Sequence, residues 1–199
     1  MKIMVDLDRV VFDCPSFTYF LGNLLFTRSN QRRPLKYKVV DAEKAKNAIN
    51  SLFFLKPTHI KNLVEVNNAV EILKLWNKQK IEIHFVSSRP NLKSFQKVAV
   101  EWLAKNKIAY DKLIFACNNK PKYCEENDID IMIDDTIENC INSAYLGIIA
   151  LWFRTKNNKN INYYPEFIFP VSHWKEINKY VQIFFGNTKG NINYTNLEK

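Results

Sequence analysis

The chain has 199 residues, of which 47% are hydrophobic and 25% are charged, a balance that predicts one domain with a buried core and excludes wholesale disorder. Only four glycines are present, which excludes a nucleotide-binding loop built on repeated glycines. The formal net charge of +9 favours anionic ligands such as nucleotides, sugar phosphates or nucleic acid, although a general bias toward lysine explains it equally well.

Five short runs rich in Ile, Val, Leu and Phe are predicted to be strands of a parallel sheet, because such strands are buried on both faces. Amphipathic helices are predicted where apolar residues recur at helical spacing. Strands that alternate with helices predict an α/β fold with a Rossmann-like parallel sheet flanked by helices. The predicted strands are residues 2–5, 81–86, 112–116, 130–133 and 148–153. The predicted helices cover residues 70–76, 95–103, 137–144 and 173–185.

The alternation breaks after the first strand, where the connection is far longer than a normal βα loop. We predict that residues 14–66 form a small helical cap inserted into a core made of residues 1–13 and 67–199. Aromatic residues of the cap could stack on a base, but their helical spacing favours packing. The basic segment at residues 28–38 could bind a second phosphate or nucleic acid, and a solvated surface explains it more simply.

The first candidate functional feature is Asp6-Leu7-Asp8-Arg9-Val10, at the end of the first predicted strand. Two carboxylates at alternate positions repel each other unless a proton or a cation lies between them. Mg²⁺ prefers hard oxygen ligands of this kind. Taken alone, a solvated turn is the simpler interpretation of this pattern.

Hydroxyl and lysine side chains follow at later strand or helix ends. Ser87 could hold a phosphoryl oxygen, while Ser88 could instead be the N-cap of the next helix. Lys120 could neutralise phosphate oxygens, with Lys122 as the alternative, and a solvated side chain is the competing explanation for either lysine.

A pair of adjacent carboxylates, Asp134 and Asp135, ends the fourth predicted strand. Such a pair is costly beside an apolar run unless it is paired or binds a metal. A helix start with an N-cap aspartate explains one of the two more easily than both. Open α/β sheets bind ligands at the carboxyl ends of their strands, so these features are predicted to meet at one edge.

In chain order, DLDRV, VSSRP, Lys120 and IDD resemble the four motifs of the haloacid dehalogenase-like phosphohydrolase superfamily. The resemblance spans residues 1–155. The insertion after the first motif, the segments SSRP and IDIMIDDTIEN, and the late helix with Trp174 are similar to the small-capped 5′-nucleotidase and 5′(3′)-deoxyribonucleotidase branch. The superfamily often has a second acid four residues beyond the metal aspartate, where this chain has Asn139.

The resemblance implies a Mg²⁺-dependent phosphomonoester hydrolase. It implies that Asp6 attacks phosphorus to form a phospho-aspartyl intermediate, and that Asp8 protonates the leaving alcohol and then deprotonates water. Ser87 and Lys120 would hold the transferring oxygens. The implied metal ligands are Asp6, Asp135, Asp134 and Asp8, the last through its backbone carbonyl. The implied substrate-binding residues are Ser88, Arg89 and Arg9, although Arg9 could simply point to solvent.

We expect a nucleoside monophosphate as the substrate. The alternatives are another small ester, such as a sugar phosphate or a nucleic-acid end, and a catalytically silent module that binds phosphate or nucleic acid. The N-terminus does not resemble a signal peptide, and no uninterrupted apolar stretch is long enough to span a bilayer. The four cysteines include no CxxC pair, which argues against a zinc site, and a chain that buries this much core argues against a disulfide framework. We therefore expect a cytoplasmic protein with no membrane partner.

Overall fold

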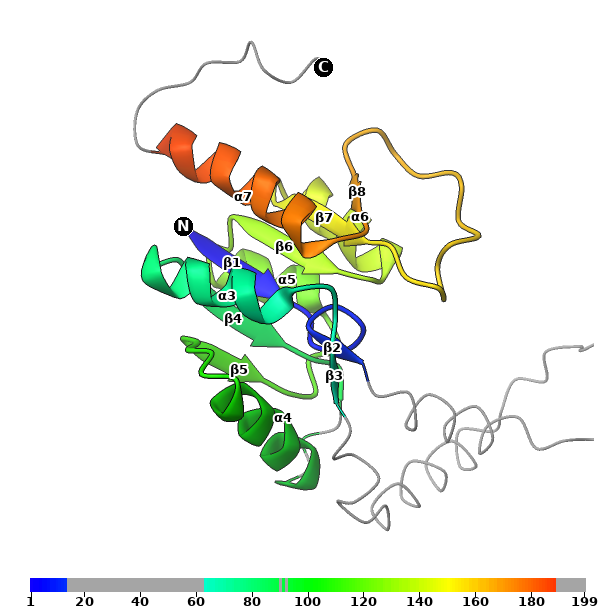
Figure 1. The fold of residues 1–199 in the computed structure, drawn as a ribbon. Coiled ribbons are helices and arrows are strands. Elements are labelled where there is room, and N and C mark those ends of the chain that lie inside the picture. Colours follow the sequence, from blue (N-terminus) through cyan, green and yellow to red (C-terminus); the bar gives the residue numbers. More distant parts are fainter. Residues whose placement is uncertain (14–62, 90, 92, 189–199) are drawn as a thin grey trace, which may run out of the picture. The chain divides into compact units, whose positions relative to one another are not determined.

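Six parallel strands form the central sheet of the computed structural model, which describes residues 1–13, 63–89, 91 and 93–188 (Figure 1). The strand order is β5-β4-β1-β6-β7-β8, so β1 lies between two strands that follow it much later in the chain. Every neighbouring pair runs parallel. The strands are β1 (Lys2–Val5), β4 (Glu82–Val86), β5 (Lys112–Ile114), β6 (Ile131–Asp134), β7 (Ile149–Phe153) and β8 (Phe169–Val171).

Helices lie on both faces of this sheet (Figure 1). In that view α3 and α7 pack side by side in front of the sheet, while α5 and α6 pack together behind it. The strands between them are buried on both faces, which explains their continuous apolar sequences. The helices are α3 (Ala69–Lys78), α4 (Lys93–Lys105), α5 (Lys120–Glu126), α6 (Ile137–Tyr145) and α7 (Trp174–Thr188).

The predicted fold class is confirmed, and the five predicted strands differ from the observed ones by at most two residues at either end. Strand β8 and helix α5 were not predicted. Pro170 lies inside β8, which is tolerated because β8 is the edge strand. Helix α5 begins with Lys120-Pro121 and has only seven residues, so it shows no apolar stripe. A short pair of strands, β2 (Phe12–Asp13) and β3 (Val64–Glu65), was also not predicted.

The predicted cap, residues 14–66, lies outside the described residues except for its last four. Its helical stretches and the basic segment at residues 28–38 therefore stay predictions. In the part of the chain that the structure describes, no helix has the length and apolar character that a membrane crossing requires.

Helix α7 supports the loop that follows β1. The Trp174 side chain is fully buried, and its indole Nε1 donates a hydrogen bond of 2.7 Å to the backbone carbonyl of Val10. Its ring lies 5.5 Å from that of Trp76 on α3, between centroids. A helix near the end of the chain therefore fixes the segment that carries the first acidic motif.

Replacing Trp174 with Phe should lower the free energy of unfolding by about 1–3 kcal/mol, because the buried carbonyl of Val10 loses its donor. Urea denaturation of the two proteins measures the difference. Tyr163→Phe is the control, since Tyr163 is exposed and its change should stay within about 0.5 kcal/mol. Equal stability of wild type and Trp174→Phe would show that this hydrogen bond does not hold the loop.

Candidate active site

The loop after β1 is closed by its own backbone hydrogen bonds. The Asp6 N–H donates to the Ile133 carbonyl at 2.9 Å, which continues the pairing of β1 with β6. Beyond it, the Arg9 N–H donates to Phe12 O at 2.8 Å, and the Phe12 N–H donates to Leu7 O at 3.2 Å. Arg9 has a φ of 63°, a left-handed conformation that a tight turn requires and that a residue with a side chain adopts at some cost. This turn presents Asp6 and Asp8 at one strand end.

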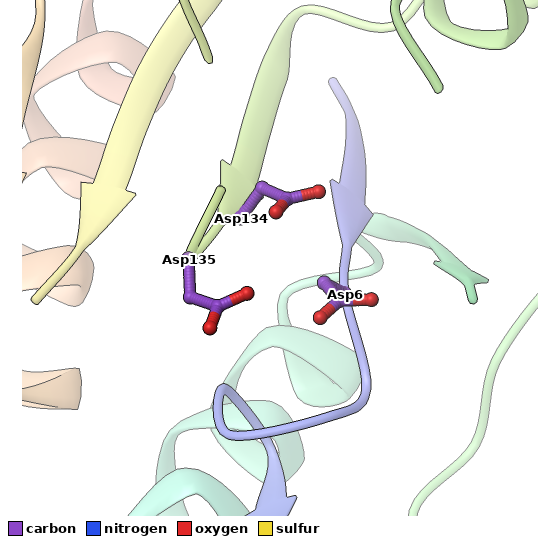
Figure 2. A group of neighbouring side chains, drawn as sticks. All are labelled: Asp6, Asp134 and Asp135. Carbon is purple, nitrogen blue, oxygen red and sulfur yellow. The ribbon is translucent and has the colours of Figure 1, made fainter. Parts of the chain in front are cut away.

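Three buried carboxylates meet where β1 and β6 end side by side (Figure 2). One carboxylate oxygen from each of Asp6, Asp134 and Asp135 lies within 4.8 Å of the other two. Asp6 follows β1, whereas Asp134 is the last residue of β6 and Asp135 follows it. Parallel pairing of the two strands brings together two motifs that are far apart in the sequence.

Lys120 neutralises part of this negative charge. Its Nζ lies 2.7 Å from Asp6 Oδ1 and 2.7 Å from Asp134 Oδ2, and its side chain is buried. It is the first residue of α5, whose N-cap Asn119 accepts a hydrogen bond from the Lys122 N–H at 3.1 Å. The Lys122 side chain is 64% exposed and pairs with Glu126 at 3.5 Å. Of the two candidate lysines, the structure therefore brings Lys120 to the carboxylates.

Burial and neighbouring charges together shift the pKa values of Asp6 and Lys120. Burial raises the pKa of Asp6 well above its ordinary value; the Lys120 ammonium opposes that rise, and Asp134 and Asp8 reinforce it. Burial by itself would lower the pKa of Lys120, but the carboxylates of Asp6 and Asp134 raise it above its ordinary value. The lysine therefore stays charged between the carboxylates of Asp6 and Asp134.

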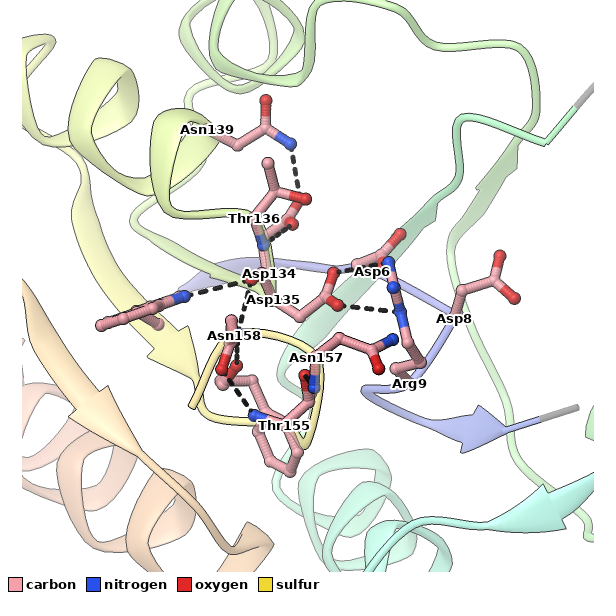
Figure 3. Close-up of polar contacts among 12 residues, drawn as sticks. Asp6, Asp8, Arg9, Asp134, Asp135, Thr136, Asn139, Thr155, Asn157 and Asn158 are labelled. Atoms are coloured by element: carbon pink, nitrogen blue, oxygen red, sulfur yellow. Dashed lines mark hydrogen bonds and ion pairs between the residues drawn. The ribbon is translucent and has the colours of Figure 1, made fainter. Parts of the chain in front are cut away.

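Asp135 is held from two sides (Figure 3). Arg9 Nε lies 2.9 Å from Asp135 Oδ2, and Arg9 Nη2 donates to Oδ1 at 3.4 Å. The backbone carbonyl of Asp135 accepts hydrogen bonds from Trp152 Nε1 at 3.0 Å and Asn158 Nδ2 at 2.8 Å. Burial raises the pKa of Asp135 to about 6, while Arg9 lowers it and Asp134 raises it further.

Asp134 is bound by α6 as well as by Lys120. The Thr136 N–H donates to Asp134 Oδ1 at 2.8 Å, and Asn139 Nδ2 donates to Oδ2 at 3.1 Å (Figure 3). The N-cap position of α6 is Thr136, so the alternative that one of the two aspartates caps this helix is wrong. At the position where the superfamily often has a second acid, Asn139 thus orients the first acid of the pair.

The segment after β4 contains Ser87, Ser88 and Arg89. Ser87 is buried and its Oγ accepts a hydrogen bond of 3.1 Å from the Arg89 N–H. Ser88 is exposed, and because α4 begins only at Lys93, the alternative that Ser88 caps this helix is wrong. The Arg89 side chain pairs with Asp8, with Nε 2.7 Å from Asp8 Oδ2. The Asp8 carboxylate is not part of the group formed by Asp6, Asp134 and Asp135.

Two residues of this site were missed by sequence reasoning. Asn158 lies in the polar segment that follows β7, where nothing in the sequence distinguishes it from its polar neighbours. Trp152 lies in a strand whose apolar sequence predicts core packing alone. Both side chains donate a hydrogen bond to the backbone carbonyl of Asp135. Because a contact with a backbone atom does not depend on the residue type that accepts it, it leaves no pattern in the sequence.

The composition of the site fits one hard divalent cation. Its three clustered carboxylates face two cationic side chains, Lys120 and Arg9, which leaves one net negative charge when all five are ionised. Carboxylate oxygens are the ligands that Mg²⁺ prefers, and no sulfur or imidazole is among them. A cation at this point would also oppose the effect of burial on Asp6.

Comparison with known proteins identifies the fold. No protein-family model matches the chain, and no curated protein matches it. Solved structures do match. A haloacid dehalogenase-like hydrolase from Xanthomonas campestris is 7% identical with a TM-score of 0.65, over 96% of this chain and 98% of that chain. A protein described as a predicted phosphatase from Clostridium acetobutylicum is 18% identical with a TM-score of 0.63, over 90% of this chain and 97% of that chain. A haloacid dehalogenase-like family protein from Streptococcus pneumoniae is 13% identical with a TM-score of 0.60, over 90% of this chain and 97% of that chain.

The raised pKa of Asp135 predicts a pH-dependent stability. The pKa of the Asp135 carboxyl is 3.8 in the unfolded chain and about 6 in the folded protein. At pH values between these two, the carboxyl is protonated only in the folded state. The proton on Asp135 therefore contributes its full stabilisation below the unfolded pKa, and this contribution is lost as the pH rises through the folded pKa. In metal-free buffer, the unfolding free energy of wild type should fall by roughly 2 kcal/mol more than that of Asp135→Asn between about pH 4 and about pH 7.

Denaturation curves across this pH range measure the effect, with Asp128→Asn as the control because the Asp128 side chain is exposed. The control should follow wild type at every pH. A profile of Asp135→Asn parallel to that of wild type would contradict the assignment of a raised pKa to Asp135.

Proposed function

We propose that this chain, which has the fold of the haloacid dehalogenase-like hydrolases, is a Mg²⁺-dependent phosphomonoester hydrolase with Asp6 as its nucleophile. One observation carries the proposal: a buried carboxylate at the end of the central strand β1 is bound by a buried lysine and faces two further carboxylates. A carboxylate placed in this way is costly to the fold, and strongly perturbed groups of this kind concentrate at functional sites.

The reaction would proceed in two displacements on phosphorus. In the first, an Asp6 carboxylate oxygen bonds to phosphorus while the bond to the ester oxygen breaks, and Asp8 gives its proton to the departing alcohol. In the second, Asp8 takes a proton from water as the water oxygen bonds to phosphorus. The phospho-aspartyl bond then breaks, inorganic phosphate leaves, and the Asp6 carboxylate is restored. Ser87 and Lys120 would hold the oxygens of the transferring group.

The main physical obstacle is the approach of an anionic nucleophile to an anionic phosphate. Two such charges at ~4 Å repel by roughly 4 kcal/mol at a partly buried site. Lys120, which touches Asp6, lowers this repulsion. The carboxylates of Asp6, Asp134 and Asp135, with the backbone carbonyl of Asp8, would hold Mg²⁺, which supplies further positive charge for the phosphate oxygens.

A nucleoside monophosphate is the substrate class that we propose. The support is the similarity of SSRP, IDIMIDDTIEN, the long insertion and the Trp174 helix to the 5′-nucleotidase branch. Arg9 and Ser88 are proposed to contact the substrate; in the structure Ser88 is exposed and Arg9 pairs with Asp135. We also propose a cytoplasmic location, supported by free thiols at Cys117, Cys124 and Cys140 in the described part of the chain.

The test is release of inorganic phosphate from a panel of nucleoside monophosphates, sugar phosphates and 3′-phosphorylated oligonucleotides, with Mg²⁺ and with a chelator. We expect turnover of nucleoside monophosphates that the chelator abolishes. Turnover of sugar phosphates or oligonucleotide ends alone would reject the nucleotidase assignment and retain the hydrolase. No turnover of any ester would reject the hydrolase and favour a binding module.

Two matched carboxylate variants connect this activity to the site. Asp6→Asn should reduce turnover by roughly 10³-fold or more, because it removes the nucleophile at almost unchanged volume. Asp130→Asn is the control, since Asp130 is exposed at the opposite end of β6 and accepts a hydrogen bond from the Lys2 N–H. Near-normal turnover in Asp6→Asn would show that Asp6 is not the nucleophile.

A further inference from the structure

Arg89 and Asp8 form a side-on ion pair beside the carboxylate cluster. Arg89 Nε lies 2.7 Å from Asp8 Oδ2, and Arg89 Nη2 contacts Asp8 Oδ1. Two donors of one rigid guanidinium on the two oxygens of one carboxylate fix the plane of that carboxylate as well as its position. Asp8 engages both of these donors, and contact of Arg89 with substrate stays a prediction.

The backbone and the ring beneath it hold Arg89 in place. Its N–H donates to Ser87 Oγ at 3.1 Å, and its carbonyl accepts a hydrogen bond of 2.8 Å from the Ala116 N–H. Its guanidinium lies over the Phe12 ring, 5.5 Å from the centroid. Phe12 closes the loop that carries Asp8, so Arg89 is anchored to both sides of the pair that it makes.

The exposure of the two partners differs. The Arg89 side chain is 5% exposed, whereas the Asp8 side chain is 28% exposed. The Asp8 carboxylate also points away from Asp135, which Figure 3 shows. The buried arginine therefore orients a carboxylate that solvent, and so a ligand, can reach.

We propose that Arg89 is a positioning residue that holds the Asp8 carboxyl in line with the leaving group, and this rests on the proposed function. In the first displacement Asp8 loses its proton to the ester oxygen as the bond from phosphorus to that oxygen breaks. The resulting carboxylate carries a full negative charge, which the two N–H donors of Arg89 stabilise in place. Arg89 itself neither bonds to phosphorus nor transfers a proton.

A comparison of leaving groups separates this role from general structural support. p-Nitrophenolate leaves as a stable anion, whereas the alkoxide of an alkyl phosphate needs a proton as it departs. Arg89→Lys keeps the charge but cannot make the side-on pair. We expect its kcat/KM, which reports the first displacement, to fall roughly 10- to 100-fold for an alkyl phosphate and less than about threefold for p-nitrophenyl phosphate. Arg89→Gln provides the same comparison if the lysine variant does not fold.

Two further variants complete the experiment. In an Asp8→Asn background, Arg89→Lys should change kcat/KM for the alkyl phosphate by less than about twofold, because the group that it positions is gone. Arg154→Lys is the matched control: Arg154 also lies over an aromatic ring, 4.3 Å from the centroid of Trp152, but does not touch Asp8. Any loss in this control should be equal for both substrates.

An equal loss for both substrates in Arg89→Lys, or an undiminished loss in the Asp8→Asn background, would overturn the positioning role and leave the hydrolase assignment intact. Wild-type turnover of p-nitrophenyl phosphate is measured first. If neither p-nitrophenyl phosphate nor any ester of the panel is turned over, the proposed function and the role of Arg89 are overturned together, so the two failures are distinguishable.

Discussion

A lysine buried between two buried carboxylates is the interaction on which the rest of this site depends. Lys120 touches both Asp6 and Asp134, and a third carboxylate, Asp135, lies beside them. Breaking a buried ion pair by removing one partner costs about 3–5 kcal/mol, because the other charge is left uncompensated. The end of β1, the end of β6 and the start of α5 supply these groups, so these three points must meet accurately for the protein to fold.

The surrounding contacts act mainly through the backbone. Asn158 and Trp152 bind the carbonyl of Asp135, and Trp174 binds the carbonyl of Val10. The donors of these hydrogen bonds lie in β7, in the loop after β7 and in α7. Through them the C-terminal third of the chain fixes the acidic motifs near residues 6 and 135. The consequence is a frame in which the Asp8 carboxylate is partly exposed, whereas its partner Arg89 is buried.

The sequence predicted the elements that follow from periodicity and apolar burial, and it missed those that follow from long-range contacts. The five predicted strands and the order of acidic, hydroxyl and lysine motifs needed only local patterns. Helix α5 is too short and begins too close to Pro121 to show a helical period, although it places Lys120. The pairing of Arg89 with Asp8 joins residues 81 positions apart, and no local pattern records it. The cap predicted at residues 14–66 stays a prediction.

Chemical trapping of the phosphorylated enzyme tests the central claim most directly. Borohydride reduces an aspartyl phosphate to homoserine, and mass spectrometry of the peptides locates the reduced residue. After brief incubation with substrate, the account predicts homoserine at position 6 in wild type and no such conversion without substrate. Conversion of a different carboxylate, or phosphate release with no trapped carboxylate at all, would contradict Asp6 as the nucleophile.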